Sequence, residues 1–350
     1  MEFNIGKVKF GGSKTVVIAE AGVNHLGKME YAEKLIKTAK SAGADIIKFQ
    51  TYKASKLTTK DAPRFWNWEG EKIKEGSQYD SYSSLDSFEK EDYEELYSLC
   101  KKYDIEFMST PFDSDSADML VKIGMKGFKI ASCDITNQPF LKHVAQYELP
   151  VLLSTGASNL EEIYEAVKVL ESNGSKKIGI MQCTLCYPTL AEDANLNAIS
   201  TIKSNFKEYL IGFSDHTLGN LIPSASILYG VKFIEKHYTF DKSLPDSADH
   251  WLSLDENEMR EMVNNLRTLE KALGSSVKEM KECEVPTHKF ARRSLVANKD
   301  LSINHVIQED DLTAKRPGTG ISPIHLNKYI GKKTKLEIKE DSLIEESWFE

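Results

Sequence analysis

Two stretches decide the fold of this chain: Leu210-Ile211-Gly212-Phe213-Ser214-Asp215-His216-Thr217 and Val231-Lys232-Phe233-Ile234-Glu235-Lys236-His237-Tyr238. Each begins as an apolar run and ends in polar residues, among them one histidine close to a carboxylate. Near-continuous apolar runs are typical of parallel strands that are buried on both faces. A helix-sized stretch separates the two, so as neighbouring parallel strands they would place His216 beside His237. Two imidazoles at that spacing suit a divalent metal of the Mn, Zn or Fe type.

The same alternation of an apolar run and a helical stretch occurs throughout the preceding sequence. Six further strands are expected at 16–20, 45–50, 106–110, 128–132, 151–155 and 178–182. Apolar residues at helical spacing predict helices near 32–39, 91–102, 114–123, 137–147, 159–172 and 255–273. Eight such units over about 270 residues are what a (β/α)8 (TIM) barrel requires. A doubly wound open sheet is the alternative, but no G-x-G-x-x-G motif follows the first strand.

The alternating pattern ends near Gly274, where a charged stretch and Pro286 follow. We expect a barrel domain over 1–275, a linker over 276–288 and a small, β-rich domain over 289–350. A domain of this size is near the lower limit for independent stability. It is therefore expected to lean on the barrel or on another subunit.

One loop of the expected barrel, residues 53–87, is too long for a simple connection. It contains several aromatic residues: Phe65, Trp66, Trp68, Tyr79 and Tyr82. Loops of this length often serve as a lid or a binding element. An insertion that merely packs over the edge of the barrel is the other interpretation.

The composition is that of a globular protein, with 41% hydrophobic and 28% charged residues and a net charge of −8. This charge disfavours binding to nucleic acid or an anionic membrane over the whole surface. There is no N-terminal signal pattern and no apolar run of about 18 residues. The five cysteines form an odd set without the spacing of a disulfide framework. We expect a protein of the reducing cytoplasm with no nucleic-acid or membrane partner.

The active site of a (β/α)8 barrel lies at the C-terminal ends of its strands. Every expected strand end carries polar or ionisable residues: Glu20; Lys48 and Gln50; Thr110; Lys129, Ser132 and Asp134; Ser154; Thr184; Ser214, Asp215 and His216; Glu235, Lys236 and His237. Lysines together with hydroxyl groups form a site for a phosphate or a carboxylate. This ring predicts a metal-assisted reaction on a small phosphorylated or carboxylated anion.

The alternation of side chains along a strand sorts the last two strand ends. Glu235 and His237 share one face, as do Ser214 and His216, so all four can point into one cavity. Asp215 and Lys236 lie on the opposite face of their strands, and we expect them to have a structural role.

The motifs that carry these residues resemble those of a known family. They are Ile18-Ala19-Glu20-Ala21-Gly22-Val23-Asn24-His25, Lys48-Phe49-Gln50, Ser109-Thr110-Pro111-Phe112-Asp113, Lys129-Ile130-Ala131-Ser132, Leu153-Ser154-Thr155-Gly156, Cys183-Thr184 with Tyr187-Pro188, and the two stretches quoted first. In this order they resemble the sialic acid (nonulosonic acid) synthase family. The tail, with Arg292-Arg293-Ser294-Leu295-Val296-Ala297 and Lys315-Arg316-Pro317-Gly318-Thr319-Gly320-Ile321-Ser322, looks like the family's antifreeze-like (SAF) domain.

The resemblance implies a condensation of phosphoenolpyruvate with the open-chain aldehyde of an N-acylated hexosamine. That sugar is N-acetylmannosamine or a deoxy, diamino relative in this family. Carbon 3 of phosphoenolpyruvate attacks the aldehyde, water adds at carbon 2, and the C–O bond to phosphate breaks. The products are a nine-carbon 2-keto acid and phosphate. The implied cofactor is a divalent metal, Mn2+ first, with Mg2+ or Co2+ as alternatives, acting as a Lewis acid on the aldehyde.

The matched motifs also imply roles for individual residues. The metal ligands would be His216 and His237, and the catalytic residues Glu20 and Glu235. Phosphoenolpyruvate would be held by Lys48, Thr110, Lys129, Ser132, Ser154, Tyr187 and Ser214. The sugar would face Gln50, Asp134, Tyr187, Asp249, Phe290 and Arg316. The last two lie in the small domain, which the family exchanges between subunits, so the resemblance implies a domain-swapped homodimer.

Four departures from the family's commoner pattern lie on or near the sugar side. Asp134 stands where Glu is usual, Leu26 replaces a polar residue, and Leu185 stands where Asn is common. Ser247-Ala248-Asp249-His250-Trp251 replaces a usual Gly-Pro-Asp-His, and Trp251 would narrow the sugar pocket if it pointed inward. Two alternatives therefore stay open: a related synthase that joins phosphoenolpyruvate to a different aldose, and a non-catalytic carbohydrate-binding paralogue. The latter would be expected to lack Glu20, Lys48, His216 or His237, all of which are present.

Overall fold

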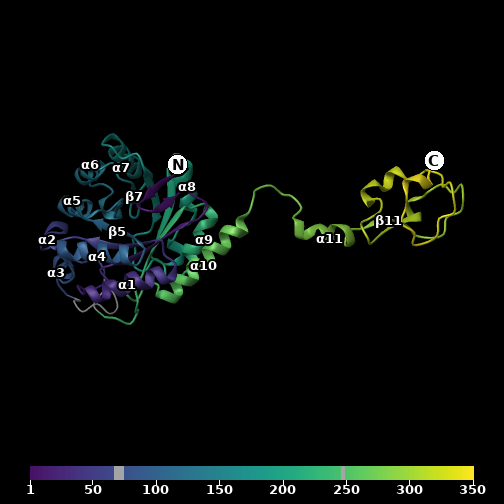
Figure 1. Ribbon diagram of the computed structural model, residues 1–350. Coiled ribbons are helices and arrows are strands. Elements are labelled where there is room, and N and C mark those ends of the chain that lie inside the picture. The colour runs from purple at the N-terminus through teal and green to yellow at the C-terminus, as the bar shows by residue number, and fades with distance from the viewer. Residues whose placement is uncertain (67–74, 246–248) are drawn as a thin grey trace. The chain divides into compact units, whose positions relative to one another are not determined.

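The computed structural model describes residues 1–66, 75–245 and 249–350. The chain divides into two compact units, Met1–Gly274 and Ser275–Glu350, which are the purple-to-green and the green-to-yellow parts of Figure 1. Trp68, Ser247 and Ala248, which the sequence singled out, lie outside the described residues. None of the described helices is long and apolar enough to cross a membrane.

The first unit is built around eight strands in the order β5-β4-β3-β10-β9-β8-β7-β6. Every hydrogen-bonded pair in this sheet is parallel. Because β5 also packs beside β6, the sheet closes, and the predicted (β/α)8 barrel is confirmed. The strands are β3 (Val16–Gly22), β4 (Ile46–Thr51), β5 (Glu106–Pro111), β6 (Phe128–Ile130), β7 (Val151–Ser154), β8 (Ile178–Cys183), β9 (Leu210–Asp215) and β10 (Phe233–His237).

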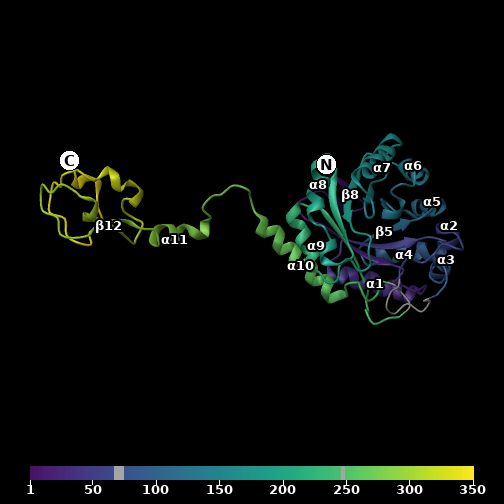
Figure 2. The same ribbon diagram turned by 180° about the vertical axis from the view of Figure 1, so that it is seen from behind.

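Helices surround the strands, as Figures 1 and 2 show from opposite sides. They are α1 (Met29–Ala42), α4 (Lys90–Lys102), α5 (Ser114–Ile123), α6 (Gln138–Ala145), α7 (Leu160–Ser172), α8 (Asn197–Asn205), α9 (Leu221–Ser226) and α10 (Glu256–Leu273). In α1 the buried residues include Ala32, Leu35, Ile36 and Ala39, at the spacing of one helix face. Their burial against the strands explains why the apolar periodicity of the sequence located this helix.

An N-terminal hairpin, which the sequence pattern did not predict, closes one end of the barrel. It consists of β1 (Phe3–Ile5) and β2 (Val8–Phe10), which pair in antiparallel fashion. Its side chains Phe3, Ile5 and Phe10 are buried in one cluster with the first residues of several barrel strands. Those residues include Val16, Ile46, Leu210 and Phe233. The hairpin therefore covers the end of the barrel opposite the polar strand ends.

The long insertion after β4 contains two short helices, α2 (Ala54–Leu57) and α3 (Gln78–Ser83). Its two ends are tied together at the base. The Nζ atom of Lys53 donates to the carbonyl oxygen of Asp86 at 2.8 Å. The backbone N–H of Ala54 donates to the Asp86 carboxylate at 2.8 Å. A loop closed in this way packs as a unit rather than as an extended connection.

The second unit contains α11 (Val285–Phe290) and one antiparallel pair, β11 (Ser294–Ala297) with β12 (Leu312–Lys315). Its small core includes Leu295, Leu301, Ile307, Ile338 and Phe349. Beside this core lies a buried carboxylate, Asp311, which accepts from the backbone N–H of Gln308 at 2.7 Å. Lys299 and His305 approach the same carboxylate at 2.7 and 2.6 Å. The unit thus combines a small apolar core with one concentrated polar anchor.

Candidate active site

A cavity of about 740 Å³ opens at the C-terminal ends of the barrel strands. The barrel residues to which the sequence assigned a catalytic or binding role all line it: Glu20, Lys48, Gln50, Thr110, Lys129, Ser132, Asp134, Ser154, Tyr187, Ser214, His216, Glu235, His237 and Asp249. Thr184, which was also counted among the strand ends, does not line it. The parallel strands bring these side chains together because each motif ends its strand at the same rim.

On one side of the cavity, Glu20 and Lys48 form a buried pair. The two residues are in register on β3 and β4, and the Lys48 Nζ lies 2.5 Å from Glu20 Oε2. Lys48 also donates to the hydroxyl of Thr110 at 2.9 Å, while Gln50 donates to Glu20 Oε1 at 3.0 Å. The carboxylate of Glu20 is thus held in one orientation, facing the cavity.

A second buried pair joins Lys129 and Glu235. Lys129 donates to Glu235 Oε1 at 2.8 Å, and the hydroxyl of Ser214 donates to the same oxygen at 3.2 Å. Burial by itself would raise the pKa of Glu235, but the ammonium groups of Lys129 and Lys48 outweigh it and hold this pKa at about 2. Burial likewise opposes the charge on Lys129, and Glu235 more than offsets that effect, so the pKa of Lys129 is raised. Both groups are therefore charged at neutral pH.

The rings of His216 and His237 lie next to each other in the cavity wall, with centroids 5.2 Å apart and planes tilted by 53°. The Nδ1 atom of His216 lies 2.8 Å from the carbonyl oxygen of Thr184, and the Nδ1 of His237 lies 3.2 Å from Asp249 Oδ2. In each ring this leaves Nε2 for a ligand. Burial lowers the pKa of His216, so this ring is neutral near pH 7.

These features fit a metal. Metal-binding histidines characteristically direct their second ring nitrogen to a carbonyl or a carboxylate, as both rings do here. A metal also requires the neutral form of the ring. Within residues 1–66, 75–245 and 249–350, however, no group of three or more His, Cys, Asp or Glu side chains is arranged as a ligand set. Among the described residues, the cavity therefore offers two imidazoles to a metal.

The wall near Asp134 follows the short 3₁₀ turn η1 (Ser132–Asp134). Asn137 donates to the Asp134 carboxylate at 3.0 Å, and burial raises the pKa of Asp134. The Ser132 hydroxyl accepts from the backbone N–H of Gly156 at 2.9 Å. Leu26 and Leu185, two of the departures noted in the sequence, line the same cavity. Trp251 does not line it, so the narrowing of the pocket by this ring does not occur.

Part of the wall is apolar, and the sequence had left the role of its residues open. This part comes largely from the insertion: Leu57, Phe65, Trp66, Tyr82 and Leu85, with Tyr52 and Phe112 beside them. Tyr82 packs against Tyr52 with ring centroids 5.5 Å apart and against Trp66 at 5.8 Å. The signal in the sequence was the clustering of aromatic residues in 53–87, and the structure favours the binding-element interpretation of this loop. Cys183 was also missed; it is buried in the wall, with Sγ 3.8 Å from His216 Nδ1.

Two predicted sugar-binding residues belong to the second unit. Phe290 ends α11 with 59% of its surface exposed, and Arg316 is also exposed. Both side chains are available for an intermolecular contact, and their role at an active site stays a prediction.

Fold and cavity together define a barrel enzyme whose open end holds buried lysine–glutamate pairs beside two histidines. Residues 35–278 match the model of the NeuB family, and residues 292–350 match the SAF domain. This chain therefore belongs to the NeuB family, the sialic acid synthases, and carries the expected SAF domain.

Several named relatives align over nearly the whole chain. The N,N'-diacetyllegionaminic acid synthase of Campylobacter jejuni is 39% identical over 95% of this chain and 99% of its own length. The N-acetylneuraminate-9-phosphate synthase of Mus musculus is 32% identical over 99% of this chain and 96% of its own. Among solved structures, the N-acetylneuraminic acid synthetase of Leptospira borgpetersenii, crystallised with citrate, matches with a TM-score of 0.72 and 35% identity. That match covers 81% of this chain and 94% of the other.

Proposed function

We propose that this protein is a metal-dependent nonulosonic acid synthase. It condenses phosphoenolpyruvate with the open-chain aldehyde of an N-acylated hexosamine and releases phosphate by C–O cleavage. The product is a nine-carbon 2-keto acid. The observation that carries this proposal is the convergence of Glu20, Lys48, Lys129, His216 and His237 on one cavity.

The charges around the cavity support the need for a cation. Its described lining residues include the lysines 28, 48 and 129 and four carboxylates, Glu20, Asp134, Glu235 and Asp249. Phosphoenolpyruvate itself carries about three negative charges, roughly two on its phosphate and one on its carboxylate. Such an anion is repelled unless more positive charge is present. A divalent ion on His216 and His237, and Arg316 of a partner subunit, would supply it.

When bound, the divalent ion supplies Lewis acidity that polarises the aldehyde of the sugar. The chain's own residues hold and orient the reactants. Lys48 and Lys129, with the hydroxyls of Thr110, Ser132, Ser154 and Ser214, bind the phosphate and carboxylate of phosphoenolpyruvate. Glu20, held by Lys48 and Gln50, orients the water that adds at carbon 2 and accepts its proton. Glu235, ionised at neutral pH, keeps Lys129 charged and in place.

The acceptor is proposed to be a diamino-deoxy hexose with two N-acyl groups rather than N-acetylmannosamine. The lining of the cavity also includes apolar and aromatic side chains, among them Leu26, Leu185, Trp66 and Tyr82. Methyl groups of N-acyl and deoxy positions gain from such a surface, whereas hydroxyl groups lose hydrogen bonds with water there. The named legionaminic acid synthases among the relatives support the same choice.

A phosphate-release assay with a panel of aldoses tests both parts of the proposal. The panel contains N-acetylmannosamine, an N,N'-diacylated diamino-deoxy hexose and plain aldoses, each with phosphoenolpyruvate and Mn2+. The masses of the products are measured by mass spectrometry. A nine-carbon keto acid from the diacylated sugar, formed with the highest kcat/KM, is expected. Preference for N-acetylmannosamine would overturn the choice of acceptor, and the absence of phosphate release with every aldose would overturn the reaction.

A further inference from the structure

An ion pair lies on the outer face of the barrel, directly behind the two histidines. Asp215 and Lys236 are partners in the β9–β10 register, and the Lys236 Nζ lies 2.7 Å from Asp215 Oδ2. Both side chains are almost fully buried, with 2% and 0% of their surface exposed. Neither lines the cavity, whereas His216 and His237, the residues that follow them, both do.

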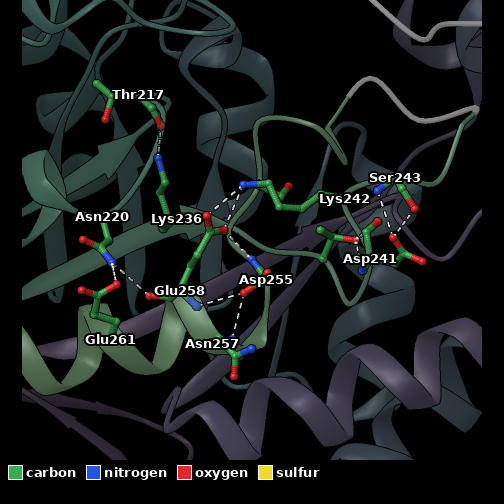
Figure 3. Close-up of polar contacts among 12 residues, drawn as sticks. Thr217, Asn220, Lys236, Asp241, Lys242, Ser243, Asp255, Asn257, Glu258 and Glu261 are labelled. Carbon is green, nitrogen blue, oxygen red and sulfur yellow. Dashed lines mark hydrogen bonds and ion pairs between the residues drawn. The ribbon is translucent and has the colours of Figure 1, made fainter.

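The same pair also holds the residue on the other side of His216. Lys236 donates to the carbonyl oxygen of Thr217, as Figure 3 shows. Asp215 accepts from the backbone N–H of Thr217 at 3.2 Å and from its hydroxyl at 2.9 Å. His216 is thus bracketed by Asp215 and Thr217, and both of these are bound to the residue that precedes His237.

The first two turns of α10 hold the loops that leave these two strands. Lys242, from the loop after β10, donates from its ammonium group to both carboxylate oxygens of Glu258, each at 3.0 Å. One of these oxygens also accepts from the backbone N–H of Asp255 at 3.0 Å, which completes the helix cap. Asn220, from the loop after β9, donates to Glu261 at 2.9 Å (Figure 3). One helix therefore fixes the polypeptide beyond both histidines.

A buried ion pair is weak evidence for stability, because the cost of desolvating two charges can exceed their attraction. The pair forms, however, in one relative placement of its two side chains. Buried pairs in some proteins serve to fix one arrangement of the backbone in this way. At this position the arrangement that is fixed is the relative placement of the two imidazoles. The fewer side chains hold a metal, the more the site depends on the placement of each one, and here the described residues offer two imidazoles.

We propose that Asp215 and Lys236 are positioning residues for the metal site: their ion pair and their shared hold on Thr217 set the separation of His216 and His237 before a metal binds. This inference rests on the proposed function, in which the two histidines hold the metal. In this inference, residues that face away from the cavity hold in place the two histidines that line it.

The test is the affinity of the full-length protein for Mn2+, measured by the electron paramagnetic resonance signal of the free ion. In the D215N/K236M variant both charges are removed together, so no buried charge is left without a partner. Its Kd for Mn2+ is expected to rise about 10- to 100-fold, the usual effect of losing groups that orient metal ligands. Thr217→Val removes only the hydroxyl bond to Asp215 and keeps the shape of the side chain. Its Kd is expected to rise by a smaller factor, about threefold.

The matched control is Arg267→Met. Arg267 lies on α10 too, but it contacts Glu270 at 2.7 Å and the carbonyl oxygen of Thr15 at 3.0 Å, where β3 begins at the other end of the barrel. Its replacement is expected to lower the free energy of unfolding without changing the Kd for Mn2+. Saturating Mn2+ is expected to restore much of the kcat of D215N/K236M, which loss of folded protein would not allow.

The outcomes distinguish a failure of the positioning role from a failure of the metal site. If the parent binds Mn2+ and both variants bind it with the same Kd while folded, the positioning role is wrong and the metal site stands. If D215N/K236M does not fold, the Kd of Thr217→Val decides, and an unchanged value overturns the inference. If the parent itself binds no Mn2+, the metal assignment and this inference fall together.

Discussion

Replacing Glu235 with glutamine removes a single buried charge from the cavity and keeps the size of the side chain. In the folded protein the pKa of Glu235 is held at about 2, against 4.5 for an unperturbed glutamate. Each pKa unit corresponds to about 1.4 kcal/mol, so the folded state favours the ionised form by about 3 kcal/mol. Glu235→Gln is expected to lower the free energy of unfolding by about that amount at pH 7, because Lys129 then remains buried beside a neutral group.

The sign of the pH dependence follows from the depressed pKa. The stabilisation by Glu235 is fully present above pH 4.5, the unfolded value, and is lost as the pH falls through about 2. The difference between parent and Glu235→Gln is therefore expected to shrink from about 3 kcal/mol at pH 7 to about 1 kcal/mol at pH 3. Urea unfolding followed by far-ultraviolet circular dichroism measures both values.

A matched control of opposite sign is Glu106→Gln at the other end of the barrel. Burial raises the pKa of Glu106, so its ionised form is disfavoured by folding. Glu106→Gln is therefore expected to raise the free energy of unfolding relative to the parent more at neutral pH than at acid pH, because the parent carboxyl group is already protonated in acid. A difference for Glu235→Gln that is equal at pH 7 and pH 3, or that has the same pH dependence as Glu106→Gln, would refute the assignment of Glu235 as a charged partner of Lys129.

Four further outcomes are expected. His237→Ala should abolish metal-dependent phosphate release from phosphoenolpyruvate plus sugar in a folded protein, and undiminished turnover would contradict the metal assignment. Trp66→Ala should raise KM for the diacylated sugar about tenfold, the effect of losing roughly 1.4 kcal/mol of apolar contact, while KM for phosphoenolpyruvate stays the same. A change in KM for phosphoenolpyruvate instead would contradict the assignment of the Trp66 ring to the sugar. Mixing Arg316→Ala with Glu20→Ala protein should restore some activity through hybrid dimers, and no recovery after confirmed subunit exchange would argue against sites shared between chains. Asp311→Asn should destabilise the second unit by about 1–3 kcal/mol, since the buried carboxylate binds Lys299, His305 and the Gln308 backbone; unchanged unfolding of that unit would show that the anchor contributes nothing.

The chain's periodicity was sufficient to predict the barrel. Each strand is an apolar run buried on both faces, and each run ends in polar residues, so counting runs was equivalent to counting strands. The same logic located the polar rim, because parallel strands place their C-terminal ends together. The hairpin β1–β2 was missed for the opposite reason: three-residue strands carry too little alternation to be distinguished from loop.

Within the site, the sequence predicted which residues meet but not which of them pair. Lys48 contacts Glu20 more closely than Glu235, at 2.5 against 3.7 Å, and Lys129 contacts Glu235 at 2.8 Å. Asp249, predicted to face the sugar, also contacts His237. These choices depend on side-chain distances across the barrel, which residue spacing along one strand does not contain.

The sequence by itself determined the number of barrel strands, the polar character of the open end and the family to which the chain belongs. Each of these is a property of local runs of residues and of their order. Only the tertiary structure decided that the insertion supplies an apolar wall, that Trp251 stays out of the cavity, and that Asp215 and Lys236 pair directly behind the histidines. Those outcomes depend on contacts between segments far apart in the chain, where packing and the pairing of buried charges select one arrangement among several that the sequence pattern allows.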